Sequence, residues 1–206
     1  MKIVAKFTAM ILLVICFFLI SSAQPLGLNA FEGQSSQKSI TYSPHRNQPV
    51  RFDKIKAAGK LFEFEAGSEF KKDFDGDDDW MRGLAITFKN TSNKNIVYVR
   101  VFLQFPETEA AGPIMSHPLQ FGRYPKKPSI GSYDNLLKLG EELEIVLTDD
   151  EYNSLQSFLK SRSFNNVNSL RLFLESVIFE DDIMWFGGDL MRRDPDNPNR
   201  WLPIDK

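Results

Sequence analysis

VYVRVFLQF, residues 97–105, is the stretch that decides the fold. Its residues alternate, so that one face of an extended chain carries Val97, Val99, Val101, Leu103 and Phe105 and the other carries Tyr98, Arg100 and Gln104. This period of two, with β-branched and aromatic residues, is typical of a half-buried antiparallel strand. Pro106 follows, and because proline cannot donate to a sheet ladder we expect the strand to end there.

The same alternation recurs along the chain between polar turns. It appears at residues 50–55, 62–66, 84–88 and 143–147, and again at 170–179 and 183–191. The last two stretches predict a hairpin across Glu180-Asp181-Asp182, since Asp tolerates the left-handed conformation of a tight turn. The sequence therefore predicts an all-β fold, an antiparallel two-sheet sandwich of about seven strands.

One helix is expected beside these strands, over about residues 149–161. Thr148 and Glu151 have the spacing of a capping box, in which each side chain satisfies an unpaired backbone N–H. Asp149 and Asp150 place negative charge at the positive end of the helix. An apolar stripe follows, made of Tyr152, Leu155, Phe158 and Leu159.

The N-terminus predicts export. Residues 1–23 match a signal peptide, with Lys2 and Lys6, an apolar run over 7–20, and small residues before Gln24. We expect a periplasmic or extracellular protein with no membrane span after cleavage; an uncleaved segment would instead anchor it to the membrane. Cleavage removes Cys16, the only cysteine, so the product would have neither a disulfide nor thiolate chemistry.

Composition sets the domain organisation. Residues 24–48 are polar without a sustained apolar period and predict a disordered leader or linker. The sandwich domain is expected over 49–206, with a long proline-containing loop at 106–140 and a tail at 192–206 rich in turn formers. The 25 basic and 27 acidic residues are nearly balanced, so nucleic acid is not an expected partner.

Loop aromatics are the main candidate binding residues. Phe121, Tyr124 and Tyr133 lie in the long loop, and Arg123 stands among them. Aromatic rings with polar neighbours suit sugar rings, peptides or partner proteins. The alternative is that these rings hold the loop against the sandwich.

Other candidates for chemistry are weaker. Asp73, Asp75 and Asp77 place oxygens at alternate positions, as a calcium site would, but the register of a calcium-binding loop fails, and a solvated turn is the rival interpretation. His45 and His117 are the only histidines, and Ser116 beside His117 lacks the pattern of a hydrolase. We therefore expect no catalytic residue, no resident metal and no cofactor.

Several motifs resemble a group of uncharacterised exported bacterial proteins of the acidobacterial type. The matching stretches are Asp79-Trp80, Lys89-Asn90-Thr91-Ser92-Asn93-Lys94, Phe105-Pro106-Glu107-Thr108, Leu147-Thr148-Asp149-Asp150-Glu151-Tyr152, Phe179-Glu180-Asp181 with Trp185 and Gly187, and Arg193-Asp194-Pro195-Asp196-Asn197-Pro198 with Arg200-Trp201. The resemblance implies an immunoglobulin-like sandwich and carries no known activity or substrate. The group tends to have Asp-Gly-Thr at the hairpin, where this chain has Asp181-Asp182-Ile183.

The leading functional hypothesis is an exported, non-catalytic binding or interaction module whose partner is a protein or glycan of the cell envelope. One alternative is a carbohydrate-binding module that uses the loop aromatics. Another is an envelope hydrolase with unrecognised acidic catalytic residues, since 27 acidic residues always offer pairs of carboxylates.

Overall fold

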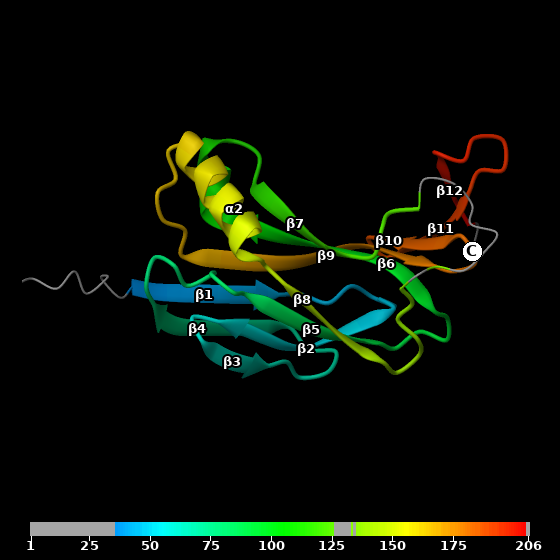
Figure 1. Ribbon diagram of the computed structural model, residues 1–206, viewed down its shortest axis with the longest axis horizontal. Coiled ribbons are helices and arrows are strands. Elements are labelled where there is room, and N and C mark those ends of the chain that lie inside the picture. Colours follow the sequence, from blue (N-terminus) through cyan, green and yellow to red (C-terminus); the bar gives the residue numbers. More distant parts are fainter. Residues whose placement is uncertain (1–35, 126–132, 134, 205–206) are drawn as a thin grey trace, which may run out of the picture. The chain divides into compact units, whose positions relative to one another are not determined.

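The computed structural model describes residues 36–125, 133 and 135–204, all of which belong to the unit Gln34–Lys206. The described strands are β1 (Ser36–Tyr42), β2 (Val50–Ala57), β3 (Lys60–Glu63), β4 (Phe70–Gly76), β5 (Ala85–Asn90), β6 (Ile96–Phe105), β7 (Met115–Phe121), β8 (Glu142–Val146), β9 (Ser169–Phe179), β10 (Ile183–Phe186), β11 (Asp189–Arg193) and β12 (Trp201–Pro203). A 3₁₀ helix, η1 (Pro106–Ala111), and the α-helix α2 (Asp149–Ser161) join them (Figure 1).

The strands form two sheets, which confirms the predicted all-β two-sheet sandwich. The smaller sheet has the order β3-β2-β5-β8. In the larger sheet β9 is central, with β6 and then β7 on one side. On its other side β9 pairs with β1 through its first half and with β10 through its second half. All pairs are antiparallel except β1 with β9, and the described part of the chain has twelve strands, more than the seven or so expected.

Strand β6 lies where its alternation predicts, with Val99, Val101, Leu103 and Phe105 fully buried in the main core. Val97 differs, because the register with β9 shifts between Ile96 and Tyr98. The shift moves Val97 into a second cluster, with Tyr98, Ile178 and Met184. One bulge therefore separates the main core from a smaller apolar cluster.

Helix α2 begins and ends as predicted. The Thr148 hydroxyl accepts a hydrogen bond from the Glu151 N–H at 3.3 Å, and the Glu151 carboxylate accepts one from the Thr148 N–H at 2.9 Å, so the capping box is formed. Tyr152, Leu155 and Leu159 pack into the main core. Phe158, the fourth residue of the expected stripe, is instead exposed, so the buried face is narrower than predicted.

The expected disordered leader at 24–48 is wrong for the part that the structure describes. Ser36–Tyr42 form β1, which lies inside the larger sheet between β4 and β9. The pattern was hidden because the alternation Lys38, Ile40, Tyr42 begins with a lysine, and this lysine is buried. The domain therefore begins before residue 49; residues 24–35, and the whole expected signal peptide, lie outside the described residues.

The long loop and the tail also contain structure. Within 106–140, where a long loop is expected, η1 is followed by β7, an edge strand that pairs with β6. The expected strand over 183–191 is two strands, β10 and β11, because Gly187 and Gly188 turn the chain with φ of 55° and 109°. Asp182, with φ of 58°, makes the predicted left-handed turn before β10. In the tail, β12 pairs with β11.

Candidate functional site

The predicted loop aromatics pack against the sandwich. Phe121 lies against the main core, while Tyr124 and Tyr133 lie against the second cluster. The Tyr124 ring meets Tyr98 edge-on, with centroids 5.3 Å apart, and its hydroxyl accepts a hydrogen bond from Trp201 Nε1 at 2.8 Å. These contacts favour the interpretation that the rings hold the loop in place.

Arg123, the fourth residue of that group, is exposed. Tyr124 and Tyr133 share the second cluster, whereas Phe121 packs against the main core.

The three aspartates of the calcium hypothesis do not converge. Asp73 and Asp75 point out from the exposed face of β4, and Asp77 follows the strand. Residues two apart on a strand are separated by more than 6 Å, because each residue rises about 3.3 Å. No group of three or more His, Cys, Asp or Glu residues in the described part of the chain is placed to hold a metal ion.

Asp75 and Asp77 instead line an open hollow of about 610 Å³ with Asp79 and Arg82. Asp79 Oδ1 accepts a hydrogen bond from the Tyr152 hydroxyl at 2.7 Å, and Arg82 stacks 4.5 Å from the Tyr152 ring centroid. Burial, and then the Asp79 carboxylate, raise the pKa of Tyr152, so the phenol stays protonated. This cluster fastens the start of α2 to the chain between β4 and β5.

Ser116 and His117 do not form a nucleophile and base. They are successive residues of β7, so their side chains leave opposite faces of the strand. His117 is partly buried, and burial lowers its pKa, while nearby Glu151 opposes this effect.

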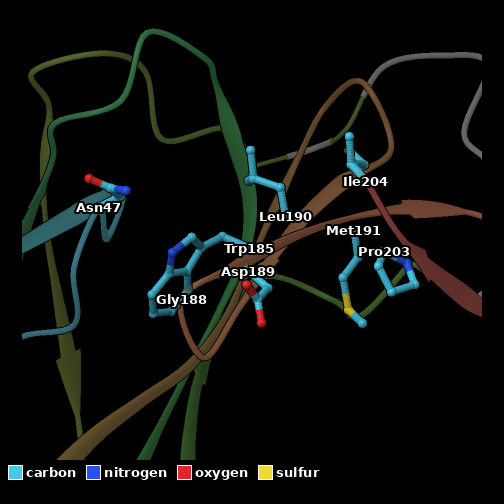
Figure 2. A pocket seen from close by; sticks show the side chains of 8 residues that line it. All are labelled: Asn47, Trp185, Gly188, Asp189, Leu190, Met191, Pro203 and Ile204. Atoms are coloured by element: carbon cyan, nitrogen blue, oxygen red, sulfur yellow. The ribbon is translucent and has the colours of Figure 1, made fainter. Parts of the chain in front are cut away.

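The most enclosed of the described hollows lies at the other end of the sandwich from α2 (Figure 1), in the three-stranded extension β10–β12. It measures about 420 Å³. Its walls are Trp185 from β10, Asp189, Leu190 and Met191 from β11, Pro203 and Ile204 from the end of β12, Gly188 from the intervening turn, and Asn47 from the loop after β1. In the view of Figure 2, the nitrogen-bearing edge of the Trp185 ring faces Asn47, and Leu190, Met191, Pro203 and Ile204 lie on the other side.

Trp185 gives this pocket its chemistry. Only 1% of its surface is exposed, yet its indole Nε1 has no hydrogen-bond partner among the described residues. The other tryptophans are satisfied, since Trp80 Nε1 donates to Val167 O and Trp201 Nε1 donates to Tyr124 Oη, both at 2.8 Å. Leaving a buried donor unpaired costs about 1–3 kcal/mol. Nε1 itself is buried, so an acceptor that entered the pocket would recover this cost once the neighbouring side chains shift to admit it.

Apolar side chains surround the opening. Leu190 is 47% exposed and Ile204 36% exposed. The expected single strand over 183–191 does not predict this pocket, because the pocket forms where the stretch divides into β10 and β11. The adjacent glycines Gly187 and Gly188 were the sequence signal that could have divided the stretch and revealed Leu190 on an exposed hairpin.

Within the described residues, no helix combines the length and the apolar character needed to cross a bilayer. Comparison with protein-family models, with curated proteins and with solved structures found no match to this chain.

Proposed function

We propose that the protein is an exported, non-catalytic binding module with an immunoglobulin-like sandwich, and that its site is the pocket between β10 and β12. The partner is a protein of the cell envelope that inserts one apolar side chain. A backbone carbonyl of the inserted segment accepts a hydrogen bond from Trp185 Nε1.

The unpaired Trp185 N–H is the observation that carries this proposal. The pocket volume of about 420 Å³ falls in the usual range for binding sites, about 300–1,000 Å³, which are mainly apolar with a few placed polar groups. Leu190 and Ile204 at the rim would be covered when a partner docks.

A protein segment suits the pocket better than a glycan. Sugar rings commonly stack on exposed aromatic faces. Trp185 is buried, and Tyr124 and Tyr133 lie half-buried in the second cluster, so none of these three rings offers such a platform.

The three tryptophans allow a direct test by NMR of the ¹⁵N-labelled protein. Trp185→Phe assigns the Trp185 indole signal. Titration with N-acetylleucinamide or N-acetylphenylalaninamide should shift that signal, while the Trp80 and Trp201 signals stay in place because both donors are already satisfied.

Leu190→Glu should abolish the shift by placing a charge at the rim. Leu61→Glu is the matched control, since Leu61 is also exposed but lies on β3 in the other sheet. No movement of the Trp185 signal with either amide contradicts the proposal. Movement with oligomers of N-acetylglucosamine, but not with the amides, favours the carbohydrate-binding alternative.

A further inference from the structure

Lys38 on β1 is a buried lysine with few partners. Its side chain has no exposed surface, and it packs beside Gly76 and Trp80, where a Cβ on residue 76 would meet Lys38 Cγ at 3.1 Å. Lys38 Nζ donates one hydrogen bond, to Asn168 Oδ1 at 2.7 Å, and lies 3.9 Å from Asp78 Oδ1. Burying an ammonium group with one of its three donors satisfied is costly. This cost disappears if the amine becomes a neutral amide.

We propose that Lys38 and Asn168 join in an intramolecular isopeptide bond between Nζ and Cγ. Asn168 immediately precedes β9, and β1 pairs in parallel with β9 through Ser39 opposite Ser169. The two side chains therefore leave neighbouring positions of adjacent strands, although 130 residues separate them in sequence.

The backbone around both groups is fixed. The Ser39 N–H donates to Asn168 O at 2.8 Å. The Glu107 carboxylate accepts hydrogen bonds from the backbone N–H groups of Asn168 and Ser169. Glu107 is a positioning residue here, because it holds the asparagine and does not touch the reacting atoms.

The distance between the reacting atoms is short. The carboxamide C=O bond is about 1.2 Å long, so Nζ at 2.7 Å from the oxygen is at most about 3.9 Å from Cγ. Reacting atoms in a near-attack geometry lie about 3–3.5 Å apart. A small rotation of the carboxamide would bring the amine over its carbon.

The reaction balances without an added reagent. The Lys38 ammonium, 3.9 Å from Asp78 Oδ1, gives a proton to Asp78 through one bridging water, and the Nζ lone pair then forms a bond to Asn168 Cγ. The negative charge passes to Oδ1, which already accepts a hydrogen bond from Ser36 Oγ at 3.3 Å. The Cγ–Nδ2 bond breaks, and Nδ2 takes a proton from the attacking nitrogen and leaves as ammonia. Asp78, which is 55% exposed, returns its proton to the ammonia or to water.

Mass spectrometry of the purified full-length protein tests the bond. Loss of ammonia should lower the intact mass by about 17 Da. Because a signal cleaved before Gln24 would expose a glutamine that also loses ammonia on cyclising, a tryptic digest must locate the change. The expected product is a branched peptide joining the segments of Lys38 and Asn168, with no cleavage after Lys38. Separate, unmodified peptides for the two residues overturn the proposal.

Two variants define the participants. Lys38→Arg should lack the branched peptide, whereas Lys72→Arg, an exposed lysine on neighbouring β4, should retain it in full. Asp78→Asn should reduce the cross-linked fraction at least tenfold at early times after synthesis. An unchanged fraction in Asp78→Asn overturns the role of Asp78 as proton acceptor.

Discussion

The main core and the three-stranded extension β10–β12 are held together by different means. The core fills the space between the two sheets with buried apolar side chains, mainly from β1 to β9 and from α2, and it also includes Trp185 of β10. The extension has one buried cluster of four residues beside it, Val97, Tyr98, Ile178 and Met184. Its turns are fastened by Arg193, whose side chain is only 4% exposed.

Arg193 connects three separate segments. Its guanidinium donates to Asp182 Oδ1 at 3.2 Å, to Pro198 O at 2.5 Å and to Pro125 O at 2.8 Å. It also stacks on the Trp201 ring, 4.5 Å from the centroid. A small sheet with little apolar area can thus be organised by one charged residue, and such a sheet has room for a pocket.

Removing a core ring should have the largest effect. Phe88 on β5 is fully buried and packs edge-on against Phe52, so Phe88→Ala should lower the free energy of unfolding by about 3–5 kcal/mol. Urea denaturation followed by fluorescence measures the change. Phe158→Ala, at an exposed position on α2, is the control and should cost less than about 0.5 kcal/mol.

Because β9 pairs with β6 in the core and with β10 in the extension, hydrogen exchange in Phe88→Ala should accelerate in β6, β9 and the extension together. Protection that falls in the core while β11 and β12 keep theirs would contradict the dependence of the extension on the core.

Loss of Arg193 should have a smaller and local effect. Hydrogen bonds to charged groups contribute about 1.5–3 kcal/mol, so Arg193→Met should lower the opening free energy of β11 and β12 by about 2–3 kcal/mol. Native-state hydrogen exchange resolves the two regions. Arg193→Lys is the informative companion variant. It keeps the positive charge, but its ammonium lacks the planar fork of donors with which the guanidinium reaches all three acceptors, so it should also lose protection. Equal loss of protection in β6 would show that the extension is not a separate unit.

The smallest effect should be a pH dependence of stability from His117, which is partly buried on β7. Burial lowers the pKa of His117 below its ordinary value of about 6.5, so the unfolded chain takes up a proton at a higher pH than the folded protein. Stability should therefore be constant above about pH 6.5 and fall as the pH decreases through the window below it.

Urea denaturation at a series of pH values measures this component, and His117→Gln should reduce it. An identical pH profile in His117→Gln would assign the dependence to other groups.

Much of the sandwich could be predicted because its strands carry one apolar face. Val99 to Phe105 and Ile86 to Phe88 show the alternation directly, and Thr148 with Glu151 fixes the start of α2. Strand β1 could not be found this way, because Lys38 is polar by type and buried by position. Alternation reports residue chemistry, and it fails where a charged side chain is buried by its tertiary surroundings.

The candidate site was less predictable than the fold. Aromatic residues attract attention in a sequence, but Tyr124 and Tyr133 are committed to packing. The candidate site is recognised by the missing acceptor for the Trp185 N–H and by the pairing of β11 with β12. Both depend on tertiary structure and are not visible in the local sequence. Among its signals, only the turn at Gly187-Gly188 is local in the sequence.

The placement of β1 between β4 and β9 also governs how quickly the protein can fold. Its partner β4 follows closely, but pairing with β9 must close a loop spanning more than a hundred residues. Such non-local pairing slows folding relative to structures built from neighbouring segments. The larger sheet cannot be completed until β9, near the end of the chain, has been synthesised. During that interval the position of β9 stays empty, and the larger sheet of the nascent protein remains incompletely folded.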